Sequence, residues 1–310
     1  METKSPMETC HLQFGQSVSK LYLATAILML YEKREIDLDA KISTYLSAEV
    51  VKGIANAEEA TVRMLMNHTS GIAEYNDKPK YVTYLLQHPL QAFSSYDYLD
   101  YIRNEPASFA PGEKYAYTNT NYLLLALLVD QVTGDHKKFI QEEILSPLFL
   151  SDTYYHNPGA MEMSRLVNTY WDRYSNGEIE NCSDMHRINV KSLIGDDGII
   201  ATPSDFITFL EKLLSHKILK ASTMEQMLDF VPTDADQENG YGLGIRKEYH
   251  DGMAELGHTG GGIGSACILG FLPHNGTYFF IGTNLGVSIS PRVAGKMEDV
   301  IDDIYDILRQ

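Results

Sequence analysis

The feature that most constrains this chain is a segment near its start that is apolar on almost every side. Apolar side chains occupy nearly all faces of a helix expected over residues 17–33, namely Leu21, Leu23, Ala24, Ala26, Ile27, Leu28 and Leu30. Its longest apolar stretch, residues 21–31, is too short to cross a bilayer. The segment therefore predicts a helix buried at the centre of a globular protein, with other elements packed around it.

The middle of the chain, from about residue 55 to 230, has the pattern of helices joined by long loops. We expect helices at 61–67, 121–132, 137–143 and 204–214. The last of these has a clear start signal, with Thr202 or Ser204 as cap and Pro203 at the entry. Long loops are expected around 73–95 and 150–189. Their aromatic residues would suit an apolar-walled cleft, although core packing explains most of them equally well.

The C-terminal part changes from helical to strand-like patterns. Short β-like runs at 241–249, 254–257, 265–272 and 278–284 are separated by turn sequences such as His274-Asn275-Gly276. This spacing predicts an antiparallel meander of three or four strands. A final helix over 293–308 is expected to carry one apolar stripe, formed by Met297, Val300, Ile301, Ile304 and Leu308.

Together these patterns predict an α+β fold, in which an antiparallel sheet is flanked by helices and a mainly helical region is inserted. We expect residues 1–55 and 215–310 to form a discontinuous sheet domain with the early helix packed beneath the sheet. Residues 56–214 form the mainly helical domain, and the active site lies between the two.

Composition narrows the classes of partner. The chain has 310 residues and a formal net charge of −17, so it would repel nucleic acid. Its three cysteines, Cys10, Cys182 and Cys267, show no metal-ligand spacing and no disulfide framework. We therefore expect no metal and no cofactor. The first residues lack the apolar region of a signal peptide, and localisation stays open.

The most specific local feature is Ser17-Val18-Ser19-Lys20. Residues three apart lie on one face of a helix, so the Ser17 hydroxyl and the Lys20 amine can meet. A neutral buried amine could accept the serine proton, and a position at a helix start supplies amide donors for a developing anion. Alone, this spacing is close to chance, although no other serine has a lysine three residues on.

Two further patterns carry polar groups suited to a cleft. In Tyr117-Thr118-Asn119, tyrosine can act as a base or proton shuttle and asparagine as a hydrogen-bond donor. The same spacing recurs at residues 155–157 and 174–176, which we interpret as surface loops because their surroundings are polar. The other pattern, His258-Thr259-Gly260 followed by Gly261, falls at a strand end where glycines allow a ligand to approach the backbone.

Ser-x-x-Lys, Tyr-x-Asn and His-Thr-Gly occur in this order along the chain. They resemble the SxxK, YxN and KTG motifs of the serine β-lactamase and penicillin-binding protein superfamily. Class C β-lactamases and the DD-carboxypeptidases and esterases related to them look most similar. The resemblance covers nearly the whole chain, through segments 14–20, 35–39, 68–71, 111–122, 147–148, 198–206 and 241–244.

The resemblance implies a Ser17 nucleophile that is acylated by a peptide, ester or lactam carbonyl. It implies that Lys20 and Tyr117 share the work of the general base and that Asn119 holds the substrate amide. The oxyanion hole would be the backbone N–H groups of Ser17 and Gly261. A DD-peptidase or another β-lactamase-related penicillin-binding protein is the leading interpretation. A carboxylesterase of the same fold and a catalytically idle binding or sensor relative are the alternatives.

On the substrate-binding strand the chain departs from the family, because His258 stands where many relatives have lysine. Thr259 beside it would help to hold a carboxylate, and Gly260 continues the motif. An unperturbed histidine is partly charged at pH 7, so we expect anionic substrates to bind better below about pH 6.5. His68, in the tetrapeptide His68-Thr69-Ser70-Gly71, matches the family too, and we expect it to be a structural interior histidine bonded to backbone.

The second departure is a short N-terminal segment: only 16 residues precede Ser17, whereas relatives carry a helix and two strands there. We expect the sheet to lack one or two N-terminal strands and to expose an edge. We expect either that another chain, such as a second copy of this one, covers that edge or that the protein is only marginally stable.

Overall fold

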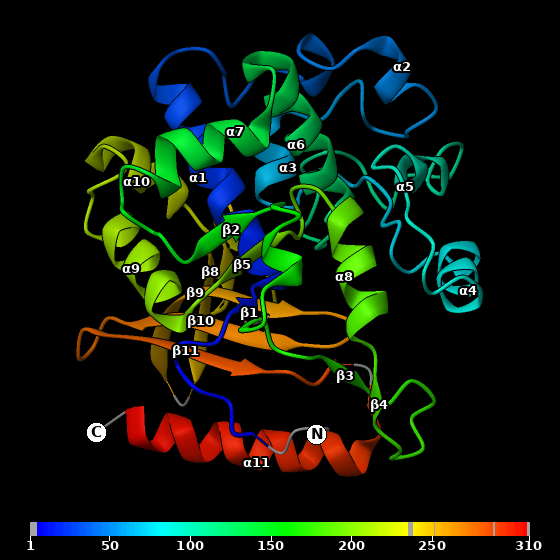
Figure 1. The fold of residues 1–310 in the computed structure, drawn as a ribbon. Helices are drawn as coiled ribbons and strands as arrows, with labels where there is room; N and C mark the ends of the chain where they lie inside the picture. Colours follow the sequence, from blue (N-terminus) through cyan, green and yellow to red (C-terminus); the bar gives the residue numbers. More distant parts are fainter. Residues whose placement is uncertain (1–4, 235–237, 251, 288, 309–310) are drawn as a thin grey trace.

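The central feature of the computed structural model is a six-stranded antiparallel sheet (Figure 1). The structure describes residues 5–234, 238–250, 252–287 and 289–308. In the sheet, the strands follow the order β11-β10-β9-β8-β7-β6. They are β6 (Val231–Pro232), β7 (Gly240–Tyr241), β8 (Arg246–His250), β9 (Met253–Gly261), β10 (Ala266–Leu272) and β11 (Thr277–Thr283). The predicted meander is confirmed, and it is two short strands longer than expected.

The sheet register places the end of β9 beside the start of β10. His258 pairs with Leu269 and Gly261 with Ala266. The turn between β10 and β11 contains Gly276 at φ 74°, a left-handed conformation that glycine adopts without strain. These pairings fix the side of the sheet on which each β9 side chain lies.

Helix α1 (Ser19–Glu32) is buried along nearly its whole length, as its sequence predicts. It contacts α6 (Asn119–Thr133) and α7 (His136–Ile140). The helix begins two residues later than expected, because Gln16–Val18 form a 3-10 turn, η1, that leads into it. Ser17 therefore lies in this turn, and the turn contacts β9.

The middle of the chain is mainly helical, as predicted. Its α-helices besides α6 and α7 are α2 (Ala48–Val51), α3 (Val62–Met66), α4 (Pro79–Gln87), α5 (Asp97–Asp100), α8 (Ser183–Ser192), α9 (Pro203–Leu214) and α10 (Ala221–Met227). Shorter turns of 3-10 or π helix are η2 (Ile42–Thr44), η3 (Gln141–Leu145) and η4 (Ala160–Glu162). At the start of α9, the Thr202 side chain accepts a hydrogen bond from the Asp205 amide. In contrast, α4 and part of α8 occupy segments that we expected to be loops.

Two small sheets complete the fold. In the first, β5 (Ile199–Ala201) lies between β1 (Gln13–Phe14) and β2 (Thr153–Tyr155). In the second, β3 (Tyr170–Trp171) pairs with β4 (Glu180–Asn181). Because β1 directly precedes η1, the first small sheet anchors the segment that enters the turn with Ser17.

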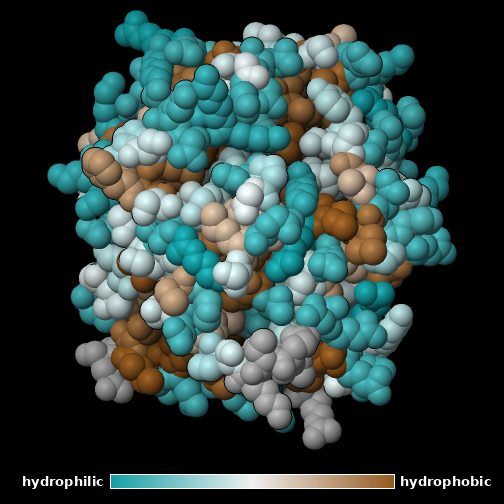
Figure 2. All heavy atoms as spheres, in the orientation of Figure 1, coloured by the Kyte–Doolittle hydropathy of each residue, from teal (hydrophilic) through white to brown (hydrophobic). Residues whose placement is uncertain are grey.

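The last helix, α11 (Pro291–Leu308), runs along the six-stranded sheet beside β11 (Figure 1). It is held by Tyr305, whose hydroxyl donates to Glu255 at 2.7 Å. Apolar side chains of this helix are only partly covered: Val300 of the predicted stripe is 56% exposed, and Ile307 outside that stripe is 69% exposed. Figure 2 shows hydrophobic side chains at this lower edge of the molecule.

Among the described residues, β11 pairs only with β10, which leaves its other edge without a strand. No described helix is long and apolar enough to span a membrane. Helix α9 packs on β10 and β11. The division of the chain into a discontinuous sheet domain and a helical domain stays a prediction.

Candidate active site

The predicted pair Ser17 and Lys20 is in contact. Lys20 Nζ donates to Ser17 Oγ at 3.0 Å, which is the distance a proton transfer between them requires. The same nitrogen donates to Asn119 Oδ1 at 2.8 Å and to the Asp196 carbonyl at 3.1 Å. Lys20 is completely buried, whereas Ser17 is half-buried.

Asn119 is the first residue of α6, and Tyr117 lies two residues before it. The Lys20 Nζ atom lies 5.0 Å from the centre of the Tyr117 ring. Thus two predicted motif residues that are about 100 positions from Ser17 in the chain meet Ser17 at one lysine. The structure brings together the residues that the sequence patterns selected separately.

The backbone before Ser17 is held in an unusual conformation. Gln16 has φ 51°, a left-handed value that is uncommon for a non-glycine residue. Its side-chain amide lies 2.7 Å from His186 Nε2 and donates to Ser265 Oγ at 2.8 Å. On the other side, a Cβ atom at Gly260 would meet the Gly15 carbonyl oxygen at 2.3 Å. Only glycine therefore lets β9 approach the turn that carries Ser17 this closely.

A cavity of about 360 Å³ opens in front of Ser17. Ser17, Tyr117, Asn119 and Gly261 line it, and Lys20 lies directly behind Ser17. The remaining lining comes from Gln16, Tyr75, Asn76, Tyr81, Val82, Leu85, Trp171, His186, Asn189, Leu193, Asp196, Asp197, Gly262, Ile263 and Val287. His258, Thr259 and Gly260 are not among the described residues that line it.

His258 is buried, and our expectation of a partly charged ring there is wrong. The ring lies 2.8 Å from the Tyr241 hydroxyl through Nε2 and 2.6 Å from the Thr259 carbonyl through Nδ1. Burial, and then the charges of Arg246 and Lys20, lower the pKa of His258 well below 6.5. The ring is therefore neutral at pH 7, and tighter binding of anions below pH 6.5 no longer follows from it.

The cationic side chain beside Thr259 of β9 is Arg246 of β8, which the sequence patterns did not reveal. Arg246 Nη1 donates to Thr259 Oγ1 at 2.6 Å. The same nitrogen pairs with a carboxylate oxygen of Glu248 at 2.9 Å. Its charge is thus already balanced within the protein.

Three carboxyl groups around Lys20 were also not predicted: Glu74, Asp196 and Asp197. Burial raises the pKa of Glu74 to about 7 and that of Asp197 to about 7. Asp196 accepts a hydrogen bond from the Tyr75 hydroxyl at 2.7 Å, and burial raises its pKa as well. Because no motif contains them, only the folded chain reveals these groups.

The comparison with protein families agrees with this geometry. The family model described as Beta-lactamase matches residues 1–301. This chain belongs to the β-lactamase family.

Individual members of the family are similar at low identity. Penicillin-binding protein 4* of Bacillus subtilis is 24% identical over 298 residues, which are 91% of this chain and 62% of that protein. This chain thus spans less than two thirds of that relative. A D-stereospecific amidohydrolase from Streptomyces sp. superposes with a TM-score of 0.82 at 26% identity, over 89% of this chain and 83% of that one.

An octameric penicillin-binding protein homologue from Pyrococcus abyssi superposes with a TM-score of 0.77 at 21% identity, over 94% of this chain and 66% of that one. These superpositions confirm the predicted fold class.

Some of the aromatic residues in the two long loops line the 360 Å³ cavity beside Ser17. They are Tyr75, Tyr81 and Trp171. Tyr155, in one of the two sequences that repeat the tyrosine–asparagine spacing, was expected in a surface loop but is 6% exposed, and its hydroxyl accepts from the Gly195 amide. His68 is structural as expected, since its Nδ1 accepts from the Thr118 amide at 3.2 Å.

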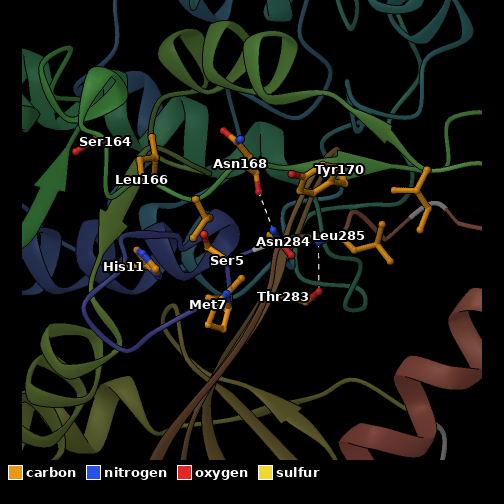
Figure 3. Close-up of a pocket in the computed structure, with 13 residues that line it drawn as sticks. Ser5, Met7, His11, Ser164, Leu166, Asn168, Tyr170, Thr283, Asn284 and Leu285 are labelled. Carbon is orange, nitrogen blue, oxygen red and sulfur yellow. Dashed lines mark hydrogen bonds between the residues drawn. The ribbon is translucent and has the colours of Figure 1, made fainter. Parts of the chain in front are cut away.

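A larger cavity, of about 630 Å³, lies elsewhere, between the N-terminal segment and the end of β11 (Figure 3). Asn284 and Asn168 line this cavity, and the side-chain amide of Asn284 donates to the Asn168 carbonyl at 2.9 Å. It contains none of the predicted site residues, so the smaller cavity is the candidate active site.

Within the part of the chain that the structure describes, one group of side chains has a spacing that could hold a metal ion: Asp130, Asp135 and His136, whose ligand atoms lie within 4.8 Å of one another. Asp135 already caps α7 through two backbone amides, and Asp130 already accepts from His136. These bonds account for the group without a metal.

Proposed function

We propose that this β-lactamase-family chain is a serine hydrolase that cleaves a peptide, ester or lactam carbonyl through an acyl-enzyme on Ser17. The observation that carries the proposal is the fully buried Lys20, whose Nζ lies 3.0 Å from Ser17 Oγ at the wall of a 360 Å³ cavity. A buried lysine is rarely tolerated without a role that repays its desolvation.

In the acylation step, Ser17 Oγ attacks the carbonyl carbon while neutral Lys20 accepts the hydroxyl proton. The negative charge that develops on the carbonyl oxygen is stabilised by the backbone N–H groups of Ser17 and Gly261. The carbonyl then re-forms as the bond to the leaving group breaks. The leaving amine or alcohol takes the proton back from Lys20, directly or through the Tyr117 hydroxyl.

In the second step a water molecule replaces the leaving group. Tyr117 is our candidate for the group that takes the proton of this water, because it lines the cavity and its ring lies 5.0 Å from Lys20 Nζ. Attack of the water on the acyl carbon releases the acid and restores the Ser17 hydroxyl. Asn119, held by Lys20, would orient the substrate amide.

The lining of the cavity favours a neutral or cationic substrate over an anionic one. Its described residues include Asp196 and Asp197 but no lysine or arginine. Arg246, beside Thr259, is already paired with Glu248. The name of the similar Streptomyces amidohydrolase makes amides a suitable first class to test. The aromatic side chains Tyr75, Tyr81 and Trp171 would accommodate an apolar acyl group.

A panel of three substrates tests this function: p-nitrophenyl acetate, D-phenylalanine amide and the anionic lactam nitrocefin. We expect the ester and the amide to be hydrolysed with a kcat/KM at least about tenfold above that for nitrocefin. Hydrolysis of the ester alone would indicate a carboxylesterase. Stable acylation by penicillin without turnover, or no reaction of folded protein, would instead indicate a binding or sensor relative.

We also propose that a second copy of the chain covers the free edge of β11. Support comes from the partly exposed apolar stripe of α11 beside it, since exposed strand edges and apolar faces are normally covered. The Pyrococcus relative is described as octameric. Sedimentation equilibrium should therefore give at least a dimer, and a stable monomer at high concentration would contradict the proposal.

A further inference from the structure

The start of α6, which carries Asn119, has no side-chain cap of its own. Thr118 is the N-cap residue, but its side chain makes no capping hydrogen bond. The first amides of a helix need external acceptors, and an anionic acceptor also interacts favourably with the helix dipole. That acceptor comes from another segment: a carboxylate oxygen of Glu74 accepts from the backbone N–H of Asn119.

Glu74 also joins this helix start to the loop that forms one wall of the cavity. Its second carboxylate oxygen accepts from the Asn76 amide at 2.8 Å. Asn76 and its neighbour Tyr75 both line the cavity. One carboxylate thus ties together two cavity walls that are more than 40 residues apart in the chain.

The residue that Glu74 holds is in direct contact with the proposed base. Asn119 Oδ1 accepts from Lys20 Nζ at 2.8 Å, and Lys20 donates to Ser17 Oγ at 3.0 Å. We propose that Glu74 is a positioning residue, whose carboxylate sets the place of Asn119 and through it the orientation of the Lys20 amine toward Ser17. This inference rests on the proposed Ser17 chemistry and adds to it a residue outside the three motifs.

The ionisation of Glu74 falls where it can influence a reaction near neutral pH. Burial raises its pKa to about 7, while its two backbone hydrogen bonds and Lys20 act in the opposite direction. The titratable groups near it are Lys20 of α1, Asp196 before β5, Tyr75, and Tyr81 of α4. The ionised carboxylate is the stronger acceptor for the Asn119 amide, so the site is best ordered above pH 7.

The test compares the rate at which a fluorophosphonate labels wild-type protein, Glu74→Gln and Glu74→Asp, between about pH 5.5 and 9. Labelling transfers the phosphonyl group to Ser17 Oγ with loss of fluoride, and intact mass reports it. Because hydrogen bonds to charged groups are stronger than neutral ones, we expect Glu74→Gln to label roughly tenfold more slowly at high pH. It should also lose the rate increase centred near pH 7, which Glu74→Asp should retain.

Glu255→Gln is the matched control. Glu255 is also a buried carboxyl whose pKa burial raises to about 7, but its partner is Tyr305 of α11. This variant should label at the wild-type rate with the wild-type pH profile. Melting temperatures measure folding separately: because folding raises the pKa of Glu74 from 4.5 to about 7, wild type should lose stability as pH rises from about 4.5 to 7, and Glu74→Gln should gain stability relative to wild type over that range.

A Glu74→Gln variant that labels as fast as wild type, or that is slower with an unchanged pH profile, would overturn the positioning role. The second result would mean that Glu74 only caps α6. If neither wild type nor variant is labelled on Ser17, the proposed function itself fails, so the two failures are distinguishable.

Discussion

Replacing Ser17 by alanine should abolish labelling of the protein by a fluorophosphonate or by penicillin. We expect intact wild-type protein to gain a single adduct mass and Ser17→Ala to gain none. Hydrolysis of p-nitrophenyl acetate should fall by roughly 10⁴-fold or more, since loss of the nucleophile removes the covalent route altogether. The reason is geometric, because Ser17 is the hydroxyl to which Lys20 donates at 3.0 Å in the cavity.

Ser19→Ala is the matched control for this experiment. Ser19 lies two residues further along and is completely buried, and its hydroxyl oxygen accepts from the Ile199 amide at 3.0 Å. Removing it should leave labelling intact but lower stability by about 1–3 kcal/mol, because the Ile199 amide loses its partner. An adduct that persists in Ser17→Ala, located on another residue by peptide mapping, would show that the nucleophile has been assigned wrongly.

The sequence predicted those parts of the fold in which one local pattern allows a single solution. A helix with apolar residues on every side can only be buried, and α1 is. Short alternating runs separated by turn residues can pair with their neighbours, and β8 to β11 do so in chain order. Two short motifs selected Ser17, Lys20, Tyr117 and Asn119, and the folded chain places them together.

What the sequence could not predict depends on tertiary contacts. Glu74 belongs to no motif. Its proposed role depends on the hydrogen bond it accepts from the backbone N–H of Asn119, 45 positions later in the chain. The neutral state of His258 follows from burial and from Arg246, neither of which its local sequence shows. Tyr155 shares the tyrosine–asparagine spacing with Tyr117, yet it is a core residue bonded to the Gly195 amide.

Replacing Lys20 by methionine should separate catalysis from stability. Methionine has a side chain of similar length and no charge, so it can fill the buried space of the Lys20 side chain without supplying an amine. We expect fluorophosphonate labelling to slow by roughly 10²- to 10⁴-fold, the usual contribution of a general base. Lys33→Met, at the other end of α1, is the control: Lys33 forms a solvent-exposed pair with Glu143 and should be dispensable for labelling.

The folding free energy of Lys20→Met should change far less than its reactivity, because two effects oppose each other. The variant leaves the Asn119 and Asp196 oxygens without their donor, which costs about 1–3 kcal/mol for each buried acceptor. It also removes a buried polar amine, whose desolvation is costly. Because Lys20 lowers the pKa values of Glu74, Asp196 and Asp197, those pKa values should rise further without it, and these carboxyls become neutral more readily. Labelling within tenfold of wild type would show that Lys20 is not the base, whereas slow labelling with a collapsed melting temperature would mean that its role is mainly structural.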